Sequence, residues 1–355
     1  MPVARLAQSS RWWSLPPGPK NSIADVDGVR VGHVTLLQDG ARTGVTAILP
    51  HGGNLFTEKV PAGATVINGF GKSLGLMQTI ELGQIETPIL LTNTFSVAPC
   101  ASALIRHAIA ANPKIGRGAP TVNALVLECN DGQVNDIQAM AVSEADASRA
   151  IATAAQDFAQ GTVGAGTGMR TFGMAGGVGS ASRMVRLASG AVFRLGAFVL
   201  SNFGQPGEMR VFGQRLDPVA PESTPPPAPE RGSIIIILAT DAPLETRQLE
   251  RLARRGTPAL GRLGSFIGHG SGDVAIAFST AYQLSAETVE DAPAIPRLCE
   301  DRLNRFFHAA VEATEEAILN AMLAAEARPG YDGKRLPTLP ERLGRAGLLG
   351  FEAAV

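Results

Sequence analysis

The sequence is poor in charge and in aromatic residues. Of its 355 residues 18% are charged and 5% aromatic, and the formal net charge at pH 7 is -1. Proteins that bind nucleic acid usually carry a clustered basic surface, and those that bind single strands add aromatic rings for stacking. The composition therefore argues against nucleic acid as a partner.

Cysteine is also scarce. Cys100, Cys129 and Cys299 are odd in number, lack disulfide-like or metal-like spacing, and lie in apolar surroundings. The five histidines form no cluster or i,i+4 pair, so we predict neither a metal nor another cofactor. Free thiols fit a reducing compartment, which favours the cytoplasm.

Long apolar runs are absent. No stretch approaches the ~20 apolar residues of a membrane span. Residues 1–20 contain basic residues and two tryptophans but lack the apolar centre of a secretory signal, so we expect no membrane association. Hydrophobic residues nevertheless make up 45% of the chain, which is enough for a large core.

The most informative stretch is a run of isoleucines that follows a proline-rich segment. Residues 213–231 are predicted to be a linker, and the run that begins at Ser233 has the β-branched composition of a fully buried strand. Gly232 precedes it, and glycine tolerates strained backbone conformations. The Ser233 hydroxyl could therefore attack the Gly232 carbonyl, and hydrolysis of the resulting ester would free an α-amine that can serve as general base.

Several β-rich runs with helices before and after them predict two packed sheets covered by helices, an αββα sandwich. Apolar periodicity and capping residues predict helices over 74–82, 93–111, 143–158 and 296–326, and a long strand over 121–129. We treat residues 1–355 as one domain of this α/β class.

Separate motifs then occur in one order along roughly residues 20–330. In this order the chain resembles the β-peptidyl aminopeptidases and L-aminopeptidase D-esterase/amidases, self-processing hydrolases with an N-terminal serine nucleophile. The motifs are Asn93-Thr94-Phe95-Ser96-Val97, Glu128-Cys129-Asn130-Asp131-Gly132 with Asn135-Asp136, Ser201-Asn202-Phe203-Gly204, Gly232-Ser233 and Ala239-Thr240-Asp241-Ala242-Pro243-Leu244.

The resemblance implies an N-terminal-nucleophile-like αββα fold, cut between Gly232 and Ser233 into an α chain (1–232) and a β chain (233–355). It implies a serine aminopeptidase/amidase that removes an N-terminal amino acid from peptides, amides or esters through an acyl-enzyme. The residue removed is left open between a β-amino acid, an L-α residue and a small D residue. The family also implies a homotetramer of α/β heterodimers.

The resemblance assigns roles to the residues around the nucleophile. Asn202 would donate to the oxyanion, and Ser271 and Asp273 would hydrogen-bond Ser233 and tune its protonation. Other members often carry glutamate where this chain has Asp273, so the shorter side chain has further to reach.

Two further residues are assigned to substrate binding. Glu128 would hold the ammonium group of the substrate, because an aminopeptidase must distinguish a chain end from an internal amide. Asn130 stands where some relatives have tyrosine, which leaves the second oxyanion donor open.

Other interpretations compete with this one. Gly71-Lys72-Ser73-Leu74-Gly75 matches the G-x-S-x-G of α/β-hydrolases, with Asp241 and either His269 or His308 later in the chain, although its strand looks too short. Gly164–Gly168 resembles a dinucleotide loop but follows a helix, so tight packing explains it better. A self-cleaving acyltransferase of the same broad fold and an unprocessed scaffold also remain open.

Overall fold

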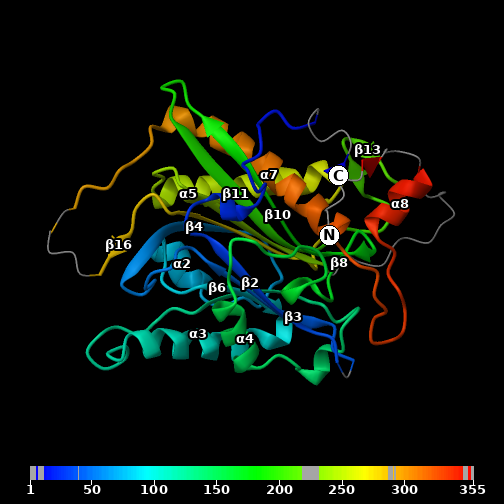
Figure 1. The fold of residues 1–355 in the computed structure, drawn as a ribbon, viewed down its shortest axis with the longest axis horizontal. Coiled ribbons are helices and arrows are strands. Elements are labelled where there is room, and N and C mark those ends of the chain that lie inside the picture. Colours follow the sequence, from blue (N-terminus) through cyan, green and yellow to red (C-terminus); the bar gives the residue numbers. More distant parts are fainter. Residues whose placement is uncertain are drawn as a thin grey trace.

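The computed structural model describes residues 5–6, 12–38, 40–217, 232–286, 291, 293–346 and 351–352. The main chain forms four layers, in which two sheets pack face to face and helices cover the outer face of each (Figure 1). The predicted αββα sandwich is confirmed. Most of the predicted linker, from residue 218 to 231, lies outside the described residues.

The larger sheet has seven strands and contains the isoleucine run near its centre. Strand β14 pairs antiparallel with β11 on one side and parallel with β15 on the other. The path runs β10-β11-β14-β15-β4-β16, and β5 also pairs with β4. The strands are β4 (Glu58–Gly69), β5 (Gln84–Ile85), β10 (Gly177–Arg186), β11 (Val192–Asn202), β14 (Ser233–Thr240), β15 (Gly272–Ser279) and β16 (Leu284–Ser285).

The smaller sheet has four strands in the order β2-β3-β6-β7, of which β6 and β7 are parallel. Helices α3 and α4 cover its outer face (Figure 1). These elements are β2 (Arg30–Leu36), β3 (Thr43–Leu49), β6 (Ile89–Asn93), β7 (Leu125–Cys129), α3 (Val97–Ala111) and α4 (Glu144–Ala152).

Two predicted elements in this region are shorter than expected. The strand over 121–129 begins only at Leu125, and the backbone N–H of Asn123 instead donates to the Glu86 carboxylate at 2.6 Å. The helix over 143–158 ends at Ala152. Beyond it Ala155 exchanges two backbone hydrogen bonds with Val31 of β2, which draws the chain away from the helix axis.

Three helices cover the outer face of the larger sheet: α5 (Thr246–Ala253), α6 (Thr257–Arg262) and α7 (Leu303–Leu323). The predicted helix over 296–326 is wrong at its start, because α7 begins only at Leu303. The backbone of Leu298 is used elsewhere: its N–H donates to Pro243 O at 2.8 Å, and its carbonyl accepts from the Gln248 amide at 2.8 Å.

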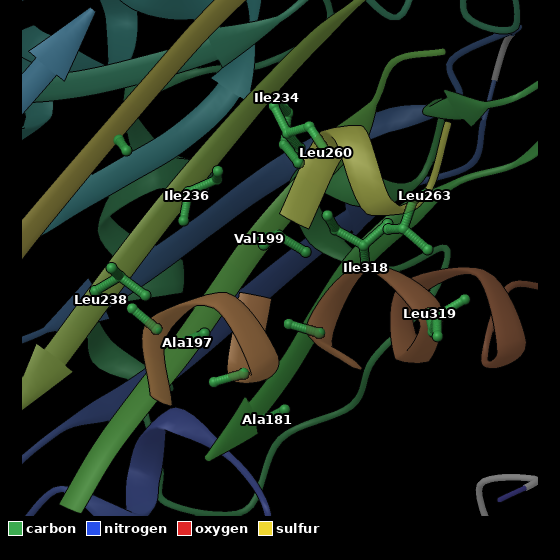
Figure 2. Close-up of a cluster of buried hydrophobic side chains, with 14 of the residues drawn as sticks. Ala181, Ala197, Val199, Ile234, Ile236, Leu238, Leu260, Leu263, Ile318 and Leu319 are labelled. Carbon is green, nitrogen blue, oxygen red and sulfur yellow. The ribbon is translucent and has the colours of Figure 1, made fainter. Parts of the chain in front are cut away.

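Strand β14 is buried on both faces, which explains its continuous apolar sequence. Alternate side chains enter two different cores, as the period of two requires. Ile234, Ile236 and Leu238 pack with α6 and α7 (Figure 2), whereas Ile235 and Ile237 lie between the two sheets.

The N-terminal segment is anchored on α7 by buried acids. The indole N–H groups of Trp12 and Trp13 donate to the Glu315 carboxylate at 3.1 and 3.2 Å. Arg183 of β10 donates from Nε to Glu312 at 3.1 Å, and both side chains are 1–2% exposed. This buried cluster joins residues from both sides of the predicted cleavage point.

None of the helices among the described residues combines the length and the apolar character needed to cross a bilayer.

The remaining described helices and strands are short. The elements are α2 (Leu76–Leu82), α8 (Leu339–Ala346) and three two-stranded ladders: β1 (Arg5–Leu6) with β17 (Phe351–Glu352), β8 (Arg170–Thr171) with β9 (Met174–Ala175), and β12 (Arg210–Val211) with β13 (Gln214–Arg215).

Candidate active site

The site is built where three neighbouring strands of the larger sheet end or begin. Ser233 is the first residue of β14, and the strand register places it directly opposite Asn202, the last residue of β11. On the other side Gly272 is the first residue of β15. The backbone N–H of Gly272 donates to Ser233 Oγ at 3.2 Å. The nucleophile predicted from the sequence therefore lies between two polar strand ends.

The peptide bond before Ser233 is held in a closely packed position. Ser233 Oγ donates to the Gly232 carbonyl oxygen at 2.6 Å, and the Gly272 N–H donates to the same oxygen at 3.3 Å. A Cβ on Gly232 would lie 2.6 Å from the Asn202 carbonyl oxygen, which excludes any larger residue. A hydroxyl and a polarised carbonyl thus stand side by side, as an acyl shift requires.

Gly272 is restricted in the same way. A Cβ at this position would meet the backbone of Gly71 at 2.7 Å and Ser233 Oγ at 3.1 Å. The absence of a side chain lets the loop after β4 approach the nucleophile. Gly272 was not predicted as a site residue, because its contribution is a backbone N–H that carries no residue signature.

Ser271 and Asp273 flank Gly272 and are both buried. Ser271 Oγ donates to Asp273 Oδ1 at 2.6 Å, and the backbone N–H of Ile234 donates to that same oxygen at 3.0 Å. Although its side chain is shorter than that of glutamate, Asp273 thus reaches the backbone of β14 at the residue after Ser233. The role of this pair in tuning Ser233 stays a prediction.

The Asn202 side chain is fixed at both ends. Its Nδ2 donates to the Asn130 carbonyl oxygen at 3.0 Å, and its Oδ1 accepts from the Arg170 N–H at 2.8 Å. The Asn130 side chain is exposed and turns back to accept from the Gly132 N–H at 2.9 Å. Asn130 therefore touches Asn202 through its carbonyl, and a second oxyanion donor from its side chain stays a prediction.

Glu128 lies near the end of β7 and is 2% exposed. Its carboxylate accepts from the Lys72 backbone N–H at 2.7 Å and from the Thr94 hydroxyl. Among the described residues no basic side chain pairs with it. A Cβ on Gly71 would lie 3.4 Å from Glu128 Oε1 and 3.7 Å from Gly272 Cα, so Gly71 lies between the carboxylate and Gly272, which itself contacts Ser233.

The alternative nucleophile Ser73 lacks the partners of a catalytic triad. The strand before it, β4, has 12 residues, so the short strand expected from the sequence is wrong. However, Ser73 Oγ is buried without a hydrogen-bond partner among the described residues. The His269 ring lies against Phe70, with the ring centroids 6.2 Å apart, but no hydrogen bond joins it to Ser73 Oγ among the described residues. Asp241 follows the last residue of β14, at the end opposite Ser233. His308 pairs with Glu312 on α7.

The glycine-rich loop over 164–168 is packed rather than open. The backbone N–H groups of Gly164 and Ala165 donate to the hydroxyls of Thr35 and Thr46 at 2.8 and 3.1 Å. These donors are not available to a phosphate. Within the described part of the chain there is also no group of three His, Cys, Asp or Glu that could hold a metal ion.

Asp131 follows this site and is fully buried. Burial raises the pKa of its carboxyl from 3.8 to about 6, partly offset by hydrogen bonds from Thr43 and Asn135. Ionising this carboxyl is therefore less favourable in the folded state than in the unfolded state. The resulting loss of stability is absent at low pH, grows between about pH 4 and 6, and is complete above pH 6.

Replacing Asp131 with Asn removes this charge and keeps an oxygen for the Asn135 amide. We expect Asp131→Asn to raise the free energy of unfolding by roughly 3 kcal/mol at pH 8 and by little at pH 4. Urea unfolding at the two pH values measures the difference. A gain of equal size at both would contradict a buried ionised carboxylate.

Comparisons with known proteins identify the family. The family model "Peptidase family S58" matches residues 21–336. The β-peptidyl aminopeptidase BapA of Sphingosinicella microcystinivorans is 36% identical, over 91% of this chain and 86% of the relative. The PH0078 protein of Pyrococcus horikoshii OT3 superposes with a TM-score of 0.88 at 41% identity, covering 98% of both chains.

A further solved structure carries a description of its fold. The L-aminopeptidase D-Ala-esterase/amidase of Ochrobactrum anthropi, described as a prototype of the serine aminopeptidases and a variant of the Ntn hydrolase fold, has a TM-score of 0.85. It is 34% identical over 95% of this chain and 97% of its own. Fold, motif order and overall similarity thus lead to one assignment: the chain belongs to peptidase family S58.

Proposed function

We propose that this chain is the precursor of a serine aminopeptidase/amidase and that it activates itself by cutting the Gly232–Ser233 bond. Ser233 Oγ attacks the Gly232 carbonyl carbon, the C–N bond breaks, the hydroxyl proton passes to the departing nitrogen, and the acyl group is left on oxygen as an ester. Water then hydrolyses the ester and leaves a carboxylate on Gly232 and a free α-amine on Ser233. The observation that carries the proposal is the contact of both Ser233 Oγ and the Gly272 N–H with the Gly232 carbonyl oxygen.

The mature site would use the same hydroxyl on a substrate. The Ser233 α-amine takes the hydroxyl proton while Oγ attacks the carbonyl of the substrate's N-terminal residue. The amine then returns the proton to the leaving group, an acyl-enzyme forms, and water releases the free amino acid. In this proposal Asn202 and the Gly272 N–H donate to the oxyanion, and Asp273 with Ser271 tunes the protonation of Ser233. The contact of the Gly272 N–H with Ser233 Oγ and the hydrogen bond from Ser271 to Asp273 support these roles.

Glu128 would give the enzyme its preference for chain ends. A buried carboxylate with no cation of its own among the described residues has a clear partner in a substrate ammonium group. The names of the relatives favour β-amino acids, L-α residues or D-alanine as the residue released. A panel of the corresponding p-nitroanilides would rank them.

N-terminal sequencing of the purified protein tests the activation step. We expect two chains, residues 1–232 and 233–355, and a second N-terminus that reads Ser-Ile-Ile-Ile. A single full-length chain that hydrolyses amides would contradict the mechanism, because Ser233 would then have no α-amine. A single inactive chain would favour the scaffold.

An acyltransferase would share the acyl-enzyme but pass it to an amine. Adding an acceptor amine to the amide assay separates the two, because a hydrolase releases the free amino acid as its main product. The resemblance to the family further leads us to propose a homotetramer of α/β heterodimers, which sedimentation would test.

A further inference from the structure

Arg170 contacts Asn202, the residue that the strand register places opposite the proposed nucleophile, and has no role in the mechanism above. Its backbone N–H donates to Asn202 Oδ1 at 2.8 Å, which places the residue at the edge of the site. Its Nη1 donates to Gln133 Oε1. Gln133 follows Asn130, whose carbonyl holds the other end of the Asn202 amide at 3.0 Å. The guanidinium therefore lies along the turn that positions Asn202.

In the part of the chain that the structure describes, this guanidinium lacks a negative partner. It carries five N–H donors. Among the described residues its acceptor is the neutral Gln133 amide, Nε is buried without a partner, and no carboxylate pairs with it. Burial lowers the pKa of Arg170, and no acid counteracts this. A half-buried cation left in this state gains strongly from an anionic ligand, and guanidinium matches carboxylate geometry.

Glu128 and Arg170 are two charges without an ionic partner among the described residues, and each is linked to a different neighbour of strand β14. Strand β14 lies between β11 and β15. Arg170 is attached to Asn202 at the end of β11. The Glu128 carboxylate lies beside Gly71, which packs on Gly272 at the start of β15. A free dipeptide has the complementary pattern, with an ammonium at one end, a carboxylate at the other and the scissile amide between them.

We propose that Arg170, assisted by Gln133, binds the carboxylate of the leaving residue, so that the enzyme favours dipeptides with a free C-terminus. The inference rests on the proposed aminopeptidase function and adds its substrate class. It predicts weaker turnover of dipeptide amides and of longer peptides, because both move the negative charge away from the guanidinium.

The test compares three substrates that share the same N-terminal residue. This residue is the one whose p-nitroanilide the wild-type enzyme cleaves best. With β-alanine these are β-alanyl-L-alanine, its C-terminal amide and β-alanine p-nitroanilide. We expect the wild-type kcat/KM for the free acid to exceed that for the amide by roughly 10- to 100-fold. In Arg170→Gln this ratio should fall to within about threefold of one, because only the acid loses an ionic contact.

Three variants serve as controls. Arg170→Lys should keep part of the preference, and Arg170→Glu should favour the amide. Arg215→Gln removes a cation whose Nε is also buried without a partner but whose Nη2 pairs with Glu208 at 2.9 Å, and it should keep the wild-type ratio. Processing into two chains shows that each variant has folded.

Two results would overturn the assignment of Arg170: a wild-type ratio close to one, or an unchanged ratio in Arg170→Gln. Both are measured while the p-nitroanilide is still hydrolysed, so they leave the aminopeptidase function intact. Failure of the wild-type enzyme to cleave any of the three substrates would instead count against the proposed function and against this inference with it.

Discussion

Ser233→Ala should remain a single chain of 355 residues and lose amidase activity by at least about 10⁴-fold. Both effects would have one cause, because in the proposed mechanism the same oxygen attacks Gly232 in the precursor and the substrate in the mature enzyme. The alanine variant keeps the buried strand, since Ile234 and the residues after it are unchanged. A denaturing gel, mass spectrometry and hydrolysis of a p-nitroanilide measure the two losses.

Two variants separate chemistry from folding. Ser233→Cys retains a nucleophile and should keep measurable self-cleavage. Ser279→Ala removes another fully buried hydroxyl, at the opposite end of β15, where it donates to Ala242 O at 2.7 Å. This second variant should be processed normally. Cleavage or turnover retained by Ser233→Ala would rule out its assignment as the nucleophile.

Glu128→Gln should lower kcat/KM for substrates with a free ammonium group by roughly 10²- to 10³-fold, because a desolvated ion pair would be lost. Glutamine is nearly isosteric and its carbonyl can still accept from the Lys72 N–H. The main effect should be on KM, since the ammonium is bound before and during the reaction. Steady-state kinetics with amino-acid p-nitroanilides would show it.

Self-cleavage provides the internal comparison for this variant. The Gly232–Ser233 bond carries no ammonium group, so Glu128→Gln should still be processed into two chains. Glu86→Gln is a matched control, because Glu86 is also buried but has its own cation, Lys59, at 3.6 Å. Normal kinetics in Glu128→Gln, or loss of processing, would contradict a role confined to the substrate amine.

Much of the fold could be predicted because local and tertiary preferences agree. The run after Ser233 is apolar at every position, and both faces of β14 are indeed buried. The predictions that made two helices too long, past Ala152 and across Leu298, were wrong for another reason. Their backbone groups bond to β2 and to the segment before α5, and such distant partners leave no trace in local periodicity.

The site was predictable to a similar degree. Motif order singled out Ser233, Asn202 and Glu128, and the structure brings all three to one end of the larger sheet. The sequence motifs gave no indication of the Gly272 N–H, because any residue other than proline offers such a backbone donor. Arg170 was equally hidden, since the absence of a counter-charge becomes visible only in three dimensions.

The anchor of Trp12 and Trp13 on α7 has a consequence for recovery after denaturation. It joins the beginning of the proposed α chain to the proposed β chain through Glu315, while Arg183 of β10 joins the same two segments again through Glu312. If the chain is cut as proposed, these contacts connect two separate polypeptides. Refolding of processed protein should therefore be bimolecular and depend on concentration, whereas the uncut Ser233→Ala protein should regain its structure at any dilution.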